Sequence, residues 1–254
     1  MKKRREEDIL KHLETREFLS TEQAMKIAGG SAATIRRTFV SLAKNSLAQR
    51  VHGGVRRLPR EGSVAIPIAM RERWLEREKM RLAARAMDFM PEDGAVFIQG
   101  GSTMLGLAHH IKSGTVITNS IKVCSVLMQR FSAGGGPEVI LLGGMLDLKS
   151  DLLTGPRTES AIREYRAGAT FFSTRGMDEE GPLDTTDAVV ATTRAMIRNT
   201  SRCVMIADHS KFRKFGLARV VSWKAVNILV TSDHPENRRW FKMIEKQGVR
   251  VVLA

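Results

Sequence analysis

The feature that most constrains the fold is a series of short apolar segments that recurs through the last two thirds of the chain. Each has the length and β-branched or aromatic character of a buried strand. The segments are Ala95–Gln99, Thr115–Thr118, Glu138–Leu142, Ala169–Ser173, Cys203–Ala207, Asn227–Thr231 and Val249–Leu253. Most are separated by stretches of helical character, at 103–112, 120–131, 157–166, 187–199 and 236–247. This alternation predicts an α/β domain whose parallel or mixed sheet is covered by helices on both faces.

Glycine and hydroxyl residues follow several of the predicted strands. Ligands of open α/β sheets collect at the carboxyl ends of the strands. There, glycine lets the backbone approach closely, and amides and hydroxyls at helix N-termini hold anions. The residues concerned are Gly101, Ser102, Thr103, Thr118, Asn119, Ser120, Gly143 and Gly144. As a set they favour a phosphate or carboxylate site, whereas the alternative is that each polar residue only caps a helix.

The charge of the chain is divided unevenly. The 254 residues carry a formal net charge of +14. Residues 1–60 contain 14 Lys and Arg against 6 Asp and Glu, a net of +8, and the remaining 194 residues carry +6. Because 43% of the chain is hydrophobic, it is not a disordered basic tail. The division predicts a small basic module attached to a larger domain, with nucleic acid as the first partner class to consider.

The basic module has the pattern of three short helices. Apolar residues on one face predict the first helix at about 3–15. Ser20 and Gln23 have the spacing of a capping box, so the second helix begins near Thr21. Two glycines end it, and Ser31 caps a third helix. The inner stripe of that helix is Ile35, Phe39 and Leu42.

A basic hairpin follows the third helix, and the whole order is typical of a winged helix. The turn is His52-Gly53-Gly54. Arg36 or Arg37 can bind a guanine edge with two hydrogen bonds or hold phosphates. The expected DNA-binding residues are Ser31, Ala33, Thr34, Arg36, Arg37, Lys44, Arg50, His52, Arg56 and Arg57. The alternative is a helical bundle with a solvated basic face.

Two runs in this module, Thr34–Arg37 and Arg50–Gly54, resemble the signature of the DeoR family of bacterial repressors. The sequence departs from that signature at Thr38 and Phe39. The turn-rich segment from Pro59 marks a boundary. We therefore expect a winged helix at 1–58, a linker at 59–69 and an effector-binding and oligomerisation domain at 70–254. A helix at about 71–90 is expected to open the larger domain.

The larger domain also resembles the DeoR effector domain, which is similar in fold to ribose-5-phosphate isomerase and the coenzyme A transferases. The matching runs are Gly101–Thr103, Thr118–Ser120, Gly143-Gly144, Gly155-Pro156 and Asp208–Phe212. The resemblance implies a pocket for a phosphorylated sugar, with Asp208 and Lys211 among its residues and Lys211 as a phosphate partner. Arg175 is expected either to contact the anion or to pair with Asp178 or Asp184.

At six other positions the residue either matches or differs from the one usual in the family, and the sequence assigns it no role. Arg71 and Lys79 stand where the family has an Arg and a Lys, and their charges fit a surface, a dimer contact or long-range electrostatics equally well. The departures are Gln99, Met104, Val189 and Thr193. Gln99 replaces a common acidic residue, and Val189 and Thr193 replace a Glu and a Lys.

These observations predict a sequence-specific DNA-binding regulator. We expect a repressor of a carbohydrate-utilisation operon that binds double-stranded operator DNA as a homo-oligomer, a dimer or tetramer, and responds to a phosphorylated sugar. The alternative is a sugar-phosphate isomerase or transferase-like enzyme with an incidental basic N-terminus. Such an isomerase needs a carboxylate base, and the usual position holds Val189. No catalytic residue and no cofactor are therefore expected.

The cellular context is expected to be the cytoplasm. The charged start of the chain has no apolar core typical of a secretory signal, and no segment has the length of a membrane helix. Cys124 and Cys203 lie far apart and outside any Cys/His cluster. Neither a disulfide nor a metal site is therefore expected.

Overall fold

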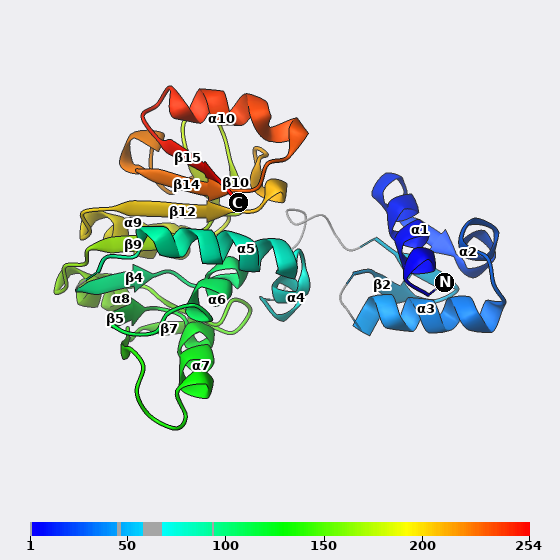
Figure 1. The fold of residues 1–254 in the computed structure, drawn as a ribbon, viewed down its shortest axis with the longest axis horizontal. Helices are drawn as coiled ribbons and strands as arrows, with labels where there is room; N and C mark the ends of the chain where they lie inside the picture. The colour runs from blue at the N-terminus through cyan, green and yellow to red at the C-terminus, as the bar shows by residue number, and fades with distance from the viewer. Residues whose placement is uncertain (1, 45–46, 58–67, 93) are drawn as a thin grey trace. The chain divides into compact units, whose positions relative to one another are not determined.

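The computed structural model describes residues 2–44, 47–57, 68–92 and 94–254. The chain forms two compact units, Met1–Trp74 and Leu75–Ala254 (Figure 1). Most of the expected linker at 59–69 lies outside the described residues, since residues 58–67 are not among them. Each unit is therefore described by itself.

The first unit contains the three expected helices and the expected hairpin. Its elements are α1 (Lys2–Thr15), β1 (Phe18–Ser20), α2 (Thr21–Ala28), α3 (Ala32–Lys44), β2 (Gln49–Val51), β3 (Gly54–Arg56) and α4 (Ile68–Arg73). The three strands form an antiparallel sheet in the order β1-β3-β2. The short strand β1 was not predicted, because three residues between two helices give no alternating pattern.

Local signals in the first unit act as predicted. Ser20 Oγ accepts a hydrogen bond from the Gln23 amide at 3.1 Å, and Gln23 Oε1 accepts one from the Ser20 amide at 3.0 Å. This capping box begins α2 at Thr21. The predicted inner stripe of α3 is confirmed, because Ile35, Phe39 and Leu42 are at most 2% exposed and pack in one apolar core with residues of α1.

The second unit is built on one seven-stranded sheet. All six strand pairings in it are parallel, and the strand order is β15-β14-β12-β9-β4-β5-β6. The strands are β4 (Ala95–Ile98), β5 (Thr115–Thr118), β6 (Glu138–Leu141), β9 (Ala169–Phe172), β12 (Cys203–Ala207), β14 (Ile228–Thr231) and β15 (Arg250–Leu253). Each predicted apolar run is thus a strand of this sheet, and the predicted α/β class is confirmed.

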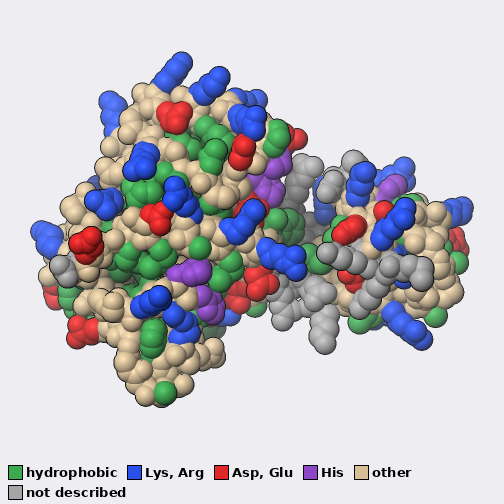
Figure 2. All heavy atoms as spheres, in the orientation of Figure 1, with side chains coloured by type: hydrophobic (Ala, Val, Ile, Leu, Met, Phe, Trp, Pro, Cys, Tyr) green, Lys and Arg blue, Asp and Glu red, His purple; other side chains and the backbone are tan. Residues whose placement is uncertain are grey.

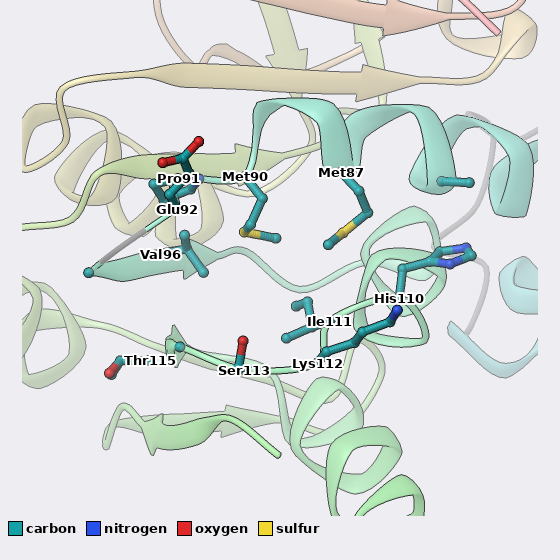
Figure 3. A pocket seen from close by; sticks show the side chains of 13 residues that line it. Met87, Met90, Pro91, Glu92, Val96, His110, Ile111, Lys112, Ser113 and Thr115 are labelled. Atoms are coloured by element: carbon teal, nitrogen blue, oxygen red, sulfur yellow. The ribbon is translucent and has the colours of Figure 1, made fainter.

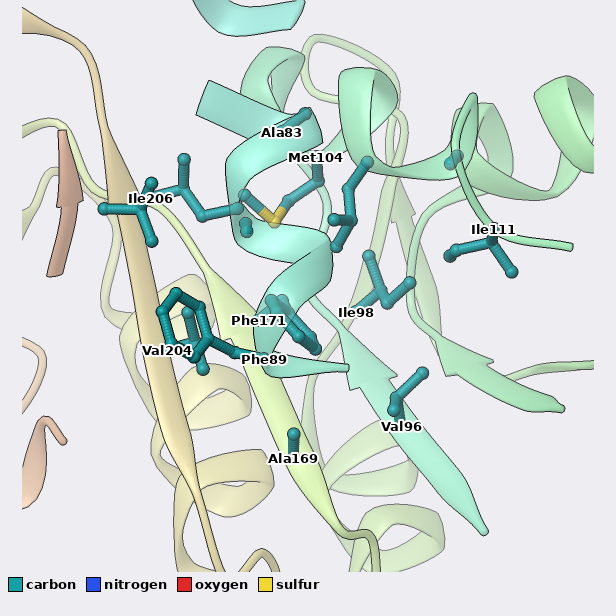
Figure 4. Packing of buried hydrophobic residues seen from close by; sticks show 14 of the residues in the cluster. Ala83, Phe89, Val96, Ile98, Met104, Ile111, Ala169, Phe171, Val204 and Ile206 are labelled. Carbon is teal, nitrogen blue, oxygen red and sulfur yellow. The ribbon is translucent and has the colours of Figure 1, made fainter. Parts of the chain in front are cut away.

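Helices cover both faces of the sheet, as expected. One face is covered by α5 (Glu76–Ala86), α6 (Ser102–Ala108) and α7 (Ile121–Arg130), and the other by α8 (Pro156–Arg163), α9 (Asp187–Arg198) and α10 (Arg238–Glu245). Successive residues of a strand point to opposite faces. Ile98 and Phe171 therefore pack beneath α5 and α6 (Figure 4), whereas Phe97 packs against α8 and α9.

The prediction of one helix over 71–90 is wrong. The described helix α4 ends at Arg73, Leu75 has a left-handed φ of 54°, and α5 begins at Glu76. Helix α5 ends at Ala86 and is followed by the 3₁₀ turn η1 (Met87–Phe89). Neither glycine nor proline marks the break at Leu75, so the sequence carries no ordinary signal for it. Leu82 is fully buried, while Trp74 and Met87 are only partly buried.

Two small antiparallel sheets were also not predicted. One pairs β7 (Met145–Asp147) with β8 (Leu152–Thr154), and the other joins β10 (Gly176–Met177), β11 (Pro182–Asp184) and β13 (Ala218–Arg219). Strands of two or three residues have too little periodicity to be read from sequence. Among the described helices, none combines the length and the apolar character of a membrane span.

The order of the strands fixes where a ligand site is expected. The chain runs outward from β4 to β5 and β6, then returns to β9 on the other side of β4 and runs outward through β12, β14 and β15. The strands stay parallel, but the side toward which the chain adds new strands changes between the neighbours β4 and β9. In open α/β sheets the ligand crevice lies at such a reversal, at the carboxyl ends of the strands. Gln99 and Ser173 follow β4 and β9 at this point.

Candidate functional site

The exposed side of α3 carries the arginines predicted to contact DNA. Ala33, Arg36 and Arg37 are exposed, on the side away from the buried stripe. Ser31 lies before the helix, where its Oγ accepts a hydrogen bond from the Thr34 amide at 3.3 Å and lies 3.0 Å from Thr34 Oγ1. Ser31 and Thr34 thus hold the first turn of α3. Lys44 ends the helix, and its side chain lies outside the described residues.

The hairpin of β2 and β3 forms the wing. Arg50, His52 and Arg56 are exposed on it, and Arg57, just after it, is half-buried. A Cβ atom on Gly54 would lie 2.3 Å from the Leu19 carbonyl oxygen, so the wing packs directly against β1. The wing and α3 therefore present basic side chains from one small rigid unit. Basic side chains are visible on both units of the chain (Figure 2).

Gln99, which follows β4, connects this strand to α9 and to the residue after β9. Its amide Nε2 donates to Thr193 Oγ1 of α9 at 2.9 Å, and its Oε1 accepts from the Ser173 amide at 3.1 Å. Gln99 is 3% exposed and Thr193 is fully buried. Gln99, which replaces a common acidic residue, and Thr193, which replaces a Lys, are thus direct partners here.

The loops after β4 and β5 are held together by backbone and amide contacts. The Gly100 amide donates to Asn119 Oδ1 at 3.2 Å, and Asn119 Nδ2 donates to the Leu153 carbonyl at 3.0 Å. Ser120 Oγ accepts from the Val123 amide and caps α7. Thr118, which donates to the Ile98 carbonyl at 2.6 Å, is also fully buried. These hydroxyl and amide groups therefore hold the loops after β4 and β5 together, and the capping interpretation accounts for Ser120.

Gly143 and Gly144 contact a different part of the unit. Thr158 Oγ1 on α8 donates to the Gly143 carbonyl at 2.6 Å. A Cβ on Gly144 would lie 2.0 Å from the same hydroxyl, so glycine is required for this close packing. Arg175 is half-buried, and its backbone amide donates to the Leu183 carbonyl at 3.1 Å. Asp178 accepts a hydrogen bond from Arg219 at 3.3 Å.

Buried charges gather at the loop after β12. Asp208 is fully buried, and its Oδ1 accepts hydrogen bonds from the Ser210 amide at 3.0 Å and hydroxyl at 2.5 Å. Its Oδ2 has no hydrogen-bond partner among the described residues. Lys211 and Lys79 are 3% and 2% exposed. Burial raises the pKa of Asp208, but the charges of Lys211 and Lys79 outweigh it and lower that pKa.

Lys79 belongs to this site although the sequence left its role open. It extends from α5, and its Nζ lies 3.0 Å from Oγ of Ser102, the first residue of α6. Its charge also acts on Asp208 after β12. In the sequence, Lys79 stands among other charged residues of a predicted helix, and this pattern is typical of a helix face exposed to solvent. Only the packing of α5 on the sheet shows that this lysine is buried.

Glu78 joins the same helix to two further loops. Its carboxylate accepts hydrogen bonds from the His209 amide at 3.0 Å and the Ser232 hydroxyl at 2.5 Å, and lies 2.8 Å from His209 Nδ1. Burial raises the pKa of Glu78, but these hydrogen bonds lower it to about 2. The bond to Glu78 raises the pKa of His209, against an opposing effect of burial. The His209 ring also stacks on His234 with centroids 4.8 Å apart.

A cavity of about 420 Å³ lies at the other ends of the strands. It is lined by Met87, Met90 and Ile111, which lie around it in Figure 3, and by residues at the beginnings of β4 and β5. It shares no residue with the predicted effector set. Among the described residues, no group of three His, Cys, Asp or Glu side chains is placed to hold a metal ion.

A winged helix joined to an α/β unit with buried polar and charged groups at the carboxyl ends of its strands defines a class of protein, the ligand-responsive transcriptional regulators. The family of this chain follows from two matches. Residues 5–61 match the DeoR-like helix-turn-helix domain, and residues 75–233 match the DeoR C terminal sensor domain. The chain belongs to the DeoR family, and the predicted family resemblance is confirmed.

Known relatives align along almost the whole chain. The glycerol-3-phosphate regulon repressor of Escherichia coli (strain K12) is 29% identical over 235 residues, with 91% of each chain covered. The HTH-type transcriptional repressor GlcR of Bacillus subtilis (strain 168) is 25% identical, with 97% of this chain and 94% of the relative covered. The translation initiation factor eIF-2B of Pyrococcus horikoshii OT3 has a TM-score of 0.41 and 13% identity, with 89% of this chain and 81% of that chain covered.

Replacing Thr193 by Val should destabilise the second unit by about 1–3 kcal/mol, because it leaves the buried Gln99 amide without its acceptor. The control is Thr192→Val. Thr192 is equally buried on α9, and its hydroxyl also donates to the carbonyl four residues earlier. Urea denaturation followed by the fluorescence of Trp223 and Trp240 measures both variants. An equal loss in the two variants would contradict the role assigned to the Gln99–Thr193 bond.

The Glu78–His209 pair should make stability depend on pH. Because the pKa of Glu78 is lowered from 4.5 and that of His209 is raised from 6.5, the pair contributes fully between these two values. The contribution declines as pH rises through the raised pKa of His209, and also as pH falls toward 2. The stability difference between the wild type and Glu78→Gln should therefore be largest near pH 5–6 and shrink in alkaline solution.

The matched control for this titration is Glu76→Gln, an exposed carboxylate in the first turn of the same helix. Its effect on the free energy of unfolding should stay flat between pH 5 and 9. A pH-independent difference for Glu78→Gln would show that the ion pair does not form.

Proposed function

We propose that this chain is a sequence-specific repressor of a carbohydrate-utilisation operon and that a phosphorylated sugar or related metabolite controls it. The observation that carries the proposal is the group of buried charges at the carboxyl end of β12, beside the reversal of the sheet. Two lysines there, Lys79 and Lys211, are at most 3% exposed. The names of the relatives agree with this proposal, since one represses the glycerol-3-phosphate regulon.

The winged helix at 1–58 is the proposed reader of operator DNA. Arg36 and Arg37 lie on the exposed side of α3 and are proposed to contact base edges or phosphates in the major groove. The wing residues Arg50, His52 and Arg56 are proposed to follow the backbone. A dimer or tetramer of this chain would place two such units on repeated half-sites. The linker at 59–69 joins them to an effector-binding and oligomerisation domain at 70–254.

The effector is proposed to lie in the crevice at the carboxyl ends of β4, β5, β9 and β12. Lys211 supplies a cation for the phosphate, and the loops after β4 and β5 surround the sugar. Arg175 adds a further anion contact. Because a ligand shifts an equilibrium only through different affinities for two states, the effector must bind the DNA-competent and released states unequally.

We propose no catalytic role for this site, and neither a cofactor nor a metal. Val189 occupies the place of the Glu that an isomerase of this fold would use as a base, and it is 9% exposed. Asp178 is already bonded to Arg219 and to the amides of Glu180 and Gly181. The charges of Lys211 and Lys79 lower the pKa of Asp208 and so favour its ionised form. Turnover of a pentose phosphate would support the alternative of an enzyme. A repressor acts where its operator lies, which we place in the cytoplasm.

Replacing Arg36 and Arg37 together by Ala should abolish specific operator binding, and each lost phosphate contact should reduce the salt slope by roughly one unit. Fluorescence anisotropy with labelled operator, measured over a range of salt concentrations, gives both quantities. The control is Arg77→Ala with Arg81→Ala, which removes the same charge from exposed positions of α5. Sedimentation should show an unchanged oligomeric state. Unchanged affinity and slope would reject α3 as the recognition helix.

Phosphorylated sugars should stabilise the wild-type protein but not Lys211→Met. At about 100 times its dissociation constant an effector adds about 2.7 kcal/mol to the free energy of unfolding. A thermal-shift panel that contains glycerol 3-phosphate and the phosphates of common hexoses and pentoses tests this. Lys112→Met, an exposed position in the same unit, controls for net charge. No shift with any member, or an equal shift in Lys211→Met, would count against the effector site.

A further inference from the structure

A group of apolar side chains is exposed at one edge of the seven-stranded sheet. Among the described residues, eleven large hydrophobic side chains are exposed, and five of them fall within residues 139–148. These five, called the edge patch from here on, are Val139, Leu141, Met145, Leu146 and Leu148. Met145 is 71% exposed and Leu148 is 81% exposed. Single exposed apolar residues need no explanation, whereas a concentration of them marks an interaction surface.

The edge patch is held in place by ordered structure. In the hairpin of β7 and β8, the Leu153 amide donates to the Asn119 carbonyl at 2.8 Å, and Asn119 Nδ2 donates to the Leu153 carbonyl at 3.0 Å. At the tip of the hairpin, Asp147 Oδ1 accepts a hydrogen bond from the Lys149 amide at 3.0 Å, so Leu148 stands in a fixed turn. A surface that is already ordered binds a partner at little entropic cost.

Both strands that carry the edge patch have an open edge. Strand β6 ends the strand order of the large sheet, and among the described strands it pairs only with β5, while β7 pairs only with β8. Natural edge strands are usually protected by a lysine, a proline or a bulge. Residues 139–146, Val-Ile-Leu-Leu-Gly-Gly-Met-Leu, contain neither a proline nor a charged residue. The sequence of this edge therefore lacks the usual protection against contact with another chain.

The charge of the chain favours a second copy as the partner at this edge. The chain carries a formal net charge of +14, so two copies repel each other wherever their basic surfaces meet. Residues 131–148 contain no Lys or Arg, and their acidic residues are Glu138 and Asp147. An acidic partner would be drawn to the basic surfaces instead. A copy of the same chain meets the least repulsion here.

The extent of this surface also suits a dimer. A stable interface buries about 800 Å² on each partner, with roughly 20 residues a side and an apolar centre. Residues 138–151, together with the exposed side chains of α7, which packs against β6, approach that size. In a two-fold dimer the same surface lies on both sides of the contact, so apolar side chains meet apolar side chains.

We infer that the edge patch is the contact between two copies of this chain. The inference deepens the proposed function and rests on it, because a dimer places two winged helices on repeated half-sites. Met145, Leu146 and Leu148 form the apolar centre of the contact and lose their exposure to water in the dimer. The open edges of β6 and β7 lie beside this centre.

The first test compares two double variants of the full-length protein. Met145→Glu with Leu148→Glu places two carboxylates in the contact and should raise the dimer dissociation constant by roughly a hundredfold or more. The control is Leu217→Glu with Leu253→Glu, which makes the same change of charge at exposed leucines outside the edge patch, one of them on β15 at the opposite edge of the sheet (Figure 1). Sedimentation velocity over a range of concentrations gives the dissociation constants, and circular dichroism checks that both variants fold.

The second test uses the wild-type chain and does not depend on how well a variant folds. Hydrogen exchange followed by mass spectrometry is measured below and above the dimer dissociation constant. Peptides that cover residues 138–148 should exchange more slowly at the higher concentration, because the contact covers the amides of the edge strands. Peptides that cover β15 should exchange at the same rate at both concentrations.

Three results would reject the edge patch as the contact. One is a wild type that stays monomeric up to about 100 μM. Another is a dimer that survives in the Met145 and Leu148 double variant or whose 138–148 amides gain no protection. The third is protection of these amides in the monomer on addition of glycerol 3-phosphate, which would show that the patch is covered within a single chain.

Failure of this inference is distinguishable from failure of the proposed function. Binding to an isolated operator half-site needs only one winged helix. The monomeric double variant should therefore bind a half-site as the wild type does and lose only the added affinity for paired half-sites. If the wild type binds operator and the double variant remains a dimer, the repressor stands and the edge patch is rejected. If the wild type binds no operator, the proposed function fails whatever the oligomeric state.

Discussion

The organisation of the sensor unit depends on the meeting of β4 and β9 at the centre of its parallel sheet. The chain builds one half of the sheet outward from β4 and the other half outward from β9. In open α/β sheets, ligands bind at the carboxyl ends of the strands at such a point. Gln99 holds the junction, because its side chain bonds to both α9 and the backbone after β9. The polar residues of the other loops are placed around this point by strand order alone.

Helix α5 contributes charged side chains at the carboxyl ends of the strands. Its inner face has two kinds of contact. Leu82, Ala83 and Ala86 pack into the apolar core above the sheet. One turn earlier, Lys79 contacts Ser102 at the start of α6, and Glu78 contacts His209 after β12 and Ser232 after β14. Apolar burial fixes the helix, and so the two charged side chains are held where their desolvation is compensated by hydrogen bonds.

The sequence predicted the strands better than the site. Seven apolar runs were sufficient because the five inner strands are buried on both faces and have no alternation to misread, and the partly exposed edge strands β6 and β15 are also largely apolar. The polar loops after β4, β5 and β12 were found for the same reason, since they follow strong strand signals. Glu78 and Lys79 were not found, because a charged pair early in a helix reads as solvated until tertiary packing is known. The break at Leu75 was missed because a left-handed leucine has no sequence signature.

The proposed operator-binding and effector sites differ in how their cations are exposed. Arg36 and Arg37 are exposed on α3, where salt screens them and where a polyanion gains from the release of its counterions. Lys79 and Lys211 are almost completely buried, where screening is weak and a single small anion meets a strong local field. Exposed charge suits a long, repetitive partner, and buried charge suits one phosphate group of defined shape. The two proposed sites therefore differ in the kind of anion that their charges suit.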